Sequence, residues 1–244
     1  MDRRSFLGSI ILTPLLSHFL NADERQPSTL SLHLISDFPH DFLPQILYDL
    51  RERGINFGRR VWFPENTPYR MQLEKSFSAN GWEVAKNTST ASFILNHNLL
   101  SRESLPSFSL VEKGRVKDIR SGKLIHLWKE MVKRNPSSSL LTTATLKKGF
   151  PSLSSGEEAT VFFMGRKRAI LSLKIDKIYL FRHKQHEICV KIEKRKAWVE
   201  SSSCSQKICC HTPPASLEGE RIICAPNHFI LEINPSPSID TSVG

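Results

Sequence analysis

The pattern of apolar and polar positions divides the chain into two regions, and the first of them alternates strands with helices. Residues 30–35 alternate and then run apolar, which predicts a β-strand. Asp41 can cap a following helix whose apolar residues form one stripe, and Gly54 can end it. The same signals predict strands over 61–63, 82–84 and 93–95, helices over 67–80 and 121–134, and a hairpin over 108–119. This order indicates an α/β domain over residues 30–134.

The second region consists of short strands without a helical stripe. Apolar runs predict strands at 159–163, 169–173, 177–181, 187–193, 197–199, 222–223 and 229–233. Such close spacing predicts a small all-β sandwich or barrel over residues 157–234. Residues 135–156 hold proline, glycine and serine and predict a linker, and residues 235–244 predict a disordered tail. The expected fold class is therefore α/β plus all-β.

The first 22 residues predict an export signal that lies outside the fold. A positive start precedes an apolar run over 6–20 that is short for a membrane span, and Ala22 offers a small residue for cleavage. The segment Arg3-Arg4-Ser5-Phe6-Leu7 resembles the twin-arginine export signal, although Asp2 replaces the usual Ser or Thr. A Sec leader and an uncleaved anchor are the alternatives. All three place the protein outside the cytoplasm, periplasmic or membrane-anchored, with membrane contact only if the leader is uncleaved.

The formal net charge of +10 over 244 residues calls for an acidic partner or a solvated basic surface. The basic residues are scattered in short clusters, such as Arg59-Arg60 and residues 166–168, and form no long basic run. We therefore expect a solvated surface rather than nucleic-acid binding. The expected partner is an unidentified protein of the cell envelope.

The order of elements over 30–134 resembles that of a thioredoxin-like domain. Pro106 precedes the predicted hairpin, where that family has its cis-proline. The family's Cys-x-x-Cys would follow the first strand, but Asp37-Phe38-Pro39-His40 stands there and the region has no cysteine. The resemblance thus implies a scaffold that cannot perform thiol–disulfide exchange at the usual site.

Four of the five cysteines lie between residues 204 and 224. The strand 188–192, the segment Ala197-Trp-Val-Glu-Ser, Cys204-x4-Cys209 and Cys224-Ala-Pro-Asn before an apolar strand together resemble the NusG domain II family over residues 157–234. Ser205 departs from the family, which has proline there, as does Thr212-Pro213-Pro214 where a glycine is usual. The resemblance implies a small β domain, usually exported or membrane-tethered, with no established reaction.

Three interpretations of these cysteines are open. A disulfide among Cys204, Cys209 and Cys224 would stabilise an exported domain of this size by about 2–4 kcal/mol. Alternatively, the three thiolates with His211 or His228 would form a four-ligand set for zinc or an iron–sulfur centre. The third interpretation is buried, reduced thiols that pack as small hydrophobic groups.

The sequence therefore favours an exported, non-enzymatic protein that binds a partner or serves as an envelope accessory factor, with no cofactor. The alternative is a redox or electron-transfer accessory protein with a metal at the cysteines. No glycine-rich phosphate loop, nucleophile elbow or paired-carboxylate motif is present in the sequence.

Overall fold

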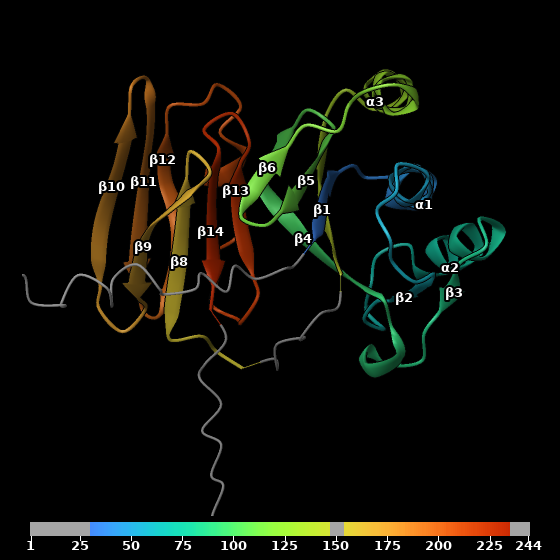
Figure 1. Ribbon diagram of the computed structural model, residues 1–244, viewed down its shortest axis with the longest axis horizontal. Coiled ribbons are helices and arrows are strands. Elements are labelled where there is room, and N and C mark those ends of the chain that lie inside the picture. The colour runs from blue at the N-terminus through green and yellow to red at the C-terminus, as the bar shows by residue number, and fades with distance from the viewer. Residues whose placement is uncertain (1–29, 147–153, 235–244) are drawn as a thin grey trace, which may run out of the picture.

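The computed structural model describes residues 30–146 and 154–234, which form an α/β part and an all-β part. Three helices cover one face of a seven-stranded sheet, and a second, all-β part lies against the other face (Figure 1). The mixed α/β part followed by small antiparallel sheets agrees with the expected fold class. No helix among the described residues is long and apolar enough to cross a membrane.

The large sheet has the strand order β3-β2-β4-β7-β1-β5-β6. Its strands are β1 (Ser31–Ile35), β2 (Arg60–Trp62), β3 (Glu83–Val84), β4 (Phe93–Ser104), β5 (Ser107–Glu112), β6 (Arg115–Lys117) and β7 (Ser138–Leu146). β2 runs parallel to β3 and β4, whereas β1 is antiparallel to both of its neighbours, β5 and β7. The thioredoxin-like identity is not confirmed.

The helices over this sheet are α1 (Pro39–Glu52), α2 (Arg70–Ala79) and α3 (Lys123–Arg134), and a 3₁₀ turn spans Thr88–Thr90. Proline suits the first turn of α1, where the missing N–H would have no partner within the helix. Each helix turns its apolar stripe toward the sheet, and the fully buried core includes Leu43, Ile46 and Leu47 of α1, Leu73 and Phe77 of α2, and Leu34, Phe93 and Leu95 of the sheet.

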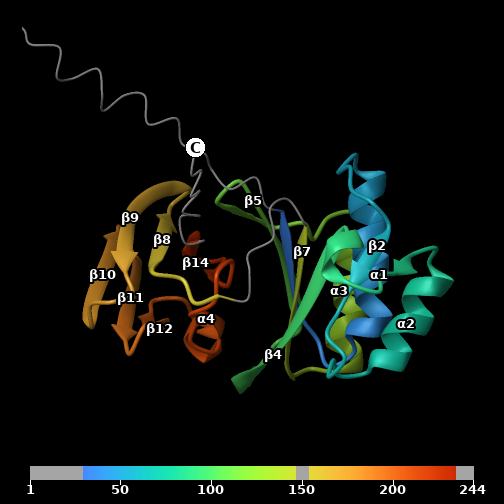
Figure 2. The ribbon, with the colours of Figure 1, turned by 90° about the horizontal axis from the view of Figure 1, so that it is seen from below.

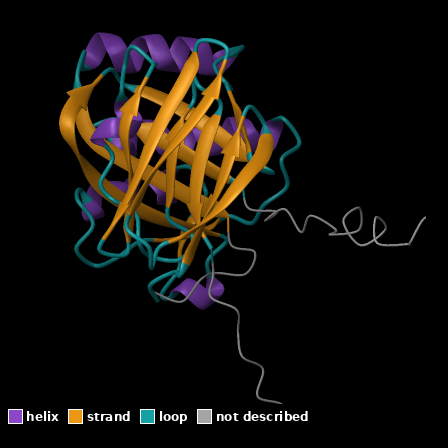
Figure 3. Ribbon diagram, turned by 90° about the vertical axis from the view of Figure 1, so that its left-hand side faces the viewer, coloured by secondary structure: helices purple, strands orange, loops and turns teal. Residues whose placement is uncertain are grey.

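The all-β part pairs two antiparallel sheets, β10-β11-β12 and β13-β14-β8-β9. Its elements are β8 (Glu158–Phe163), β9 (Arg166–Ser172), β10 (Lys177–His183), β11 (His186–Glu193), β12 (Lys196–Ser202), α4 (Ile208–His211), β13 (Arg221–Cys224) and β14 (Phe229–Ile233). Figure 3 looks onto this part, with the helices behind the strands. Alternate residues of each strand point inward and form one core, which includes Val161, Phe163, Val190, Phe229 and Leu231.

Two expectations about the first part are wrong. The linker expected over 135–156 contains β7, which lies between β4 and β1 in the large sheet. The sequence pattern did not reveal β7 because its serines and threonines interrupt the apolar run, although the strand is largely buried. Pro106 is not a cis-proline, since no described peptide bond is cis, and its carbonyl accepts a hydrogen bond from Trp128 Nε1 at 3.1 Å.

The two parts are joined by an apolar contact and a buried polar network. Val111 of β5 packs with Phe162 and Ile230 of the all-β part. Gly114 turns β5 into β6 with a φ of 69°, and a Cβ on it would lie 2.8 Å from the ring of Phe162. Glycine is therefore required at position 114 for two reasons, the conformation of the turn and the close approach of Phe162. The polar network runs through Arg221, which donates a hydrogen bond to Ser31 Oγ of β1 at 2.9 Å.

Candidate functional site

Three cysteines from three successive elements converge in the all-β part. Cys204 follows β12, Cys209 lies in α4 and Cys224 ends β13. Their Sγ atoms all lie within 4.8 Å of one another, and the residues are only 6%, 1% and 3% exposed. The structure thus brings together the three cysteines that the sequence singled out.

The local backbone explains how a short loop places two of these thiols side by side. Lys207 adopts a left-handed conformation, with a φ of 50°, and so turns the chain from the loop after Cys204 into α4. Within α4, Cys209 faces the cluster, while Ile208 packs on Ile35, Leu100 and Leu141 of the large sheet. Figure 2 shows α4 between the all-β part and β4. This one helical turn therefore connects the cysteine cluster to the α/β part.

A network of hydrogen bonds contacts the cysteine cluster. Ser202 Oγ donates to Cys204 Sγ at 3.3 Å and lies 3.6 Å from Cys224 Sγ. Asn227, 2% exposed, donates to Ser202 Oγ at 2.9 Å and pairs with the ring of His186 at 2.9 Å. Sequence reasoning included Asn227 in the family signature but missed Ser202 and His186, because nothing in the sequence shows that β11 and β12 carry them to this point.

The thiols share their protons unequally. Hydrogen bonds from Cys209 and then Cys224 lower the pKa of Cys204, against the opposing effect of burial. The pKa values of Cys209 and Cys224 are raised, first of all because each donates its proton toward Cys204. Of the three thiols, Cys204 is therefore the one whose thiolate form the cluster stabilises.

The two histidines that the sequence added to this set lie elsewhere. Neither His211 nor His228 belongs to the group of ligand atoms that converge within 4.8 Å. The Nδ1 atom of His211 lies 3.4 Å from Ser101 Oγ of β4, and His228 sits in the turn before β14 with a φ of 45°. Among the described residues, the converging ligand atoms are therefore the three thiols without a histidine.

The remaining predictions concern the thiol state of the cysteines and the export signal. All five cysteines are free thiols in the structure. Cys210 is half-buried beside the cluster, and Cys189 is half-buried in β11. The candidate export residues Arg3, Arg4, Phe6 and Leu7 lie outside the described residues.

Comparisons with known proteins identify the cysteine-bearing part. A search of curated proteins found no match. Among solved structures, a DUF1312 family protein from Ruminococcus gnavus is 26% identical, with 32% of this chain and 96% of that chain covered and a TM-score of 0.28. The Lin0431 protein from Listeria innocua is 13% identical (32% and 95% covered, TM-score 0.31), and a DUF1312 family protein from Enterococcus faecalis is 17% identical (32% and 97% covered, TM-score 0.31). Residues 138–236 match the family model of NusG domain II, so this part of the chain is similar to that family.

Proposed function

We propose that the protein is an accessory protein that binds one thiophilic metal ion, zinc or copper(I), at Cys204, Cys209 and Cys224. The observation that carries the proposal is the convergence of three buried Sγ atoms within 4.8 Å of one another. Thiolates select soft or borderline metals, and three of them suit a trigonal copper(I) site or a zinc site with one further ligand. Burial excludes competing water from such a site.

The ligand set favours a single ion over an iron–sulfur cluster. Such clusters are normally held by four cysteines, whereas among the described residues only Cys204, Cys209 and Cys224 lie mutually within 4.8 Å. Cys210 contacts Cys209 but does not belong to this group. Ser202 Oγ, 3.3 Å from Cys204 Sγ, is the polar group best placed to orient that ligand. The metal would hold together the end of β12, α4 and the end of β13, and its binding energy would add to folding stability.

The first prediction concerns metal content. The full chain, purified from its native compartment, is expected to contain about one zinc or copper per chain by elemental analysis, and a chelator is expected to lower its Tm. Free metal at a hundredfold excess over Kd would stabilise the chain by about 2.7 kcal/mol. Cys204→Ser is expected to lose the metal, whereas Cys189→Ser, in β11 and outside the cluster, is expected to keep it. A metal-free native protein whose three cluster thiols all alkylate would contradict the proposal.

A disulfide is the second candidate for the same cysteines, because their proximity also allows any two of them to pair. A bridge would leave one of the three thiols free and would contribute about 2–4 kcal/mol. Intact-mass measurement after alkylation, with and without reductant, separates the candidates. A bridge appears as two thiols that alkylate only after reduction, and it would exclude three-thiolate metal binding.

We also propose that the chain acts outside the cytoplasm by binding a protein partner of the cell envelope. The support is the order of charge, apolar run and small residue over 1–22. The second prediction is that replacing both Arg3 and Arg4 with lysine retains the chain in the cytoplasm on cell fractionation, since the twin-arginine route reads these residues. Unchanged export would indicate a Sec leader, and a wild-type chain found only in the cytoplasm would refute export.

A further inference from the structure

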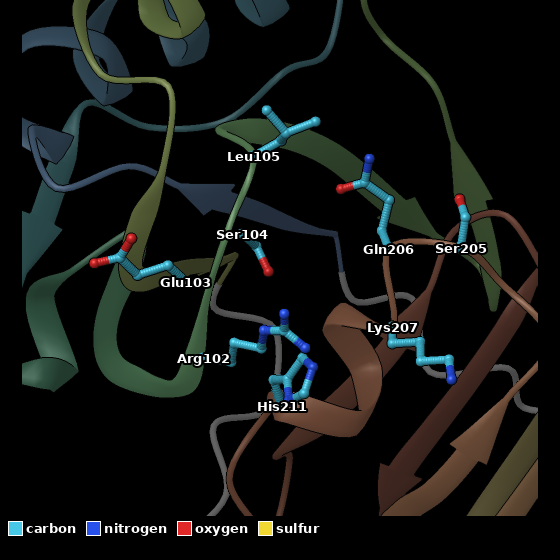
Figure 4. Close-up of a pocket in the computed structure, with 8 residues that line it drawn as sticks. All are labelled: Arg102, Glu103, Ser104, Leu105, Ser205, Gln206, Lys207 and His211. Atoms are coloured by element: carbon cyan, nitrogen blue, oxygen red, sulfur yellow. The ribbon is translucent and has the colours of Figure 1, made fainter.

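A cavity of about 320 Å³ opens where the two parts of the protein meet. Residues 102–105, at the end of β4 and the start of the turn into β5, form one wall, and residues 205–207 with His211 form the other (Figure 4). Small-molecule sites favour such junctions, and this volume lies at the lower end of their range. Its size therefore suits a small ligand.

The charges around the cavity favour an anion. Arg102 and Lys207 contribute one guanidinium and one ammonium group, and neither forms an ion pair with a carboxylate among the described residues. The only acidic group of the lining is Glu103, whose carboxylate already accepts a hydrogen bond from Ser137 Oγ at 2.6 Å. Figure 4 shows the guanidinium of Arg102 turned toward the opposite wall, whereas the side chain of Lys207 extends away from Arg102. Arg102 is therefore the cation that the lining offers to a ligand.

A second, independent observation is the hydroxyl of Ser104. The residue is only 8% exposed, and its side chain forms no hydrogen bond with another described residue. Figure 4 shows this hydroxyl turned into the space beside Arg102. The hydroxyl is not among the side-chain oxygens that are both buried and without a partner, so solvent reaches it and it is free to donate to a bound group. Gln206 adds an amide N–H₂ donor from the opposite wall.

We propose that this cavity binds a small molecule through a phosphate or carboxylate group, held by Arg102 and Ser104 on one wall and Gln206 on the other. A guanidinium matches two oxygens of such a group, and the hydroxyl and amide N–H₂ groups supply further donors. The site is separate from the cysteine cluster. Residues 205–207 nevertheless belong to the segment that connects Cys204 to Cys209, so an occupied cavity would restrain the loop that carries both thiols.

Isothermal titration calorimetry of the full chain tests this site, with inorganic phosphate in one arm and succinate in the other. At least one of the two anions is expected to bind, and comparison of the arms identifies the preferred group. Arg102→Gln is expected to weaken binding by about tenfold or more, the loss typical of one charge-assisted contact. Ser104→Ala, which leaves the net charge unchanged, is expected to weaken it several-fold.

Arg168→Gln is the matched control, because Arg168 is an exposed cation of β9 outside the cavity. It is expected to leave binding unchanged. Equal weakening by Arg102→Gln and Arg168→Gln would show attraction to the overall positive charge and would overturn the site. The absence of binding by both anions at millimolar concentration would also overturn it.

Discussion

Replacing Phe93 with alanine is expected to lower the free energy of unfolding by about 3–5 kcal/mol, the range for truncation of a buried phenylalanine. Phe93 is fully buried in β4, at the point where this strand pairs with both β2 and β7. Its ring meets Phe57 edge to face at a centroid distance of 4.7 Å and lies 6.4 Å from Trp82. The substitution therefore removes apolar burial and two aromatic contacts from the centre of the core.

Leu99→Ala is the control for this prediction, because Leu99 lies on the same strand but is 69% exposed. Its cost is expected to stay within about 0.5 kcal/mol, as for most surface substitutions. Urea unfolding followed by tryptophan fluorescence measures both values. A Phe93 variant as stable as the Leu99 variant would mean that this aromatic cluster does not hold the α/β part together.

Sequence reasoning found the elements whose burial follows a regular period. The apolar stripe of α1 and the alternation of β1 both produced elements close to their observed bounds. The hairpin over 108–119 was also recognised, and its turn contains Gly114, whose positive φ few residues other than glycine tolerate. These signals are local, so one sequence is enough to reveal them.

The errors concern features that depend on contacts between distant residues. β7 carries several hydroxyl side chains, such as Thr142, which is fully buried and lies 2.9 Å from the ring of His97. A partner 45 residues away satisfies this hydroxyl, and no local pattern predicts it. The topology of the sheet was missed for the same reason, because β7 inserts between β4 and β1 from far along the chain.

At the candidate site, too, local sequence signals were informative and contacts between distant residues were not. The three cysteines stood out by residue type and spacing, and the structure brings them together. The sequence could not decide which histidine would accompany them, because α4 turns His211 toward β4 and away from the cluster. Arg102 and Lys207 lie about a hundred positions apart, so the sequence gives no sign that both line one cavity.

The second large effect is expected at the buried ion pair between Arg221 and Glu232. Arg221 Nη2 lies 2.6 Å from Glu232 Oε1, and the two side chains are only 4% and 9% exposed. Ser31 Oγ, which accepts a second bond from Arg221, lies 3.1 Å from His33 Nε2. Burial, and then the charge of Arg221, lower the pKa of His33 to about 3, so His33 is neutral near pH 7. Arg221 is therefore the cation of this junction, and Glu232 provides its counter-charge.

Glu232→Gln is expected to destabilise the chain by about 3–5 kcal/mol, because it leaves a buried guanidinium without its counter-charge. Glu83→Gln removes the partner of Arg60 from a pair whose side chains are 55% and 68% exposed, and its cost is expected to be below about 1 kcal/mol. Replacing Arg221 with methionine together with Glu232→Leu should recover most of the lost stability, since no charge then remains buried. Equal effects of Glu232→Gln and Glu83→Gln in urea unfolding would show that water reaches the junction. The contact between the two parts would then rest on the apolar clusters around Val111 and Ile208.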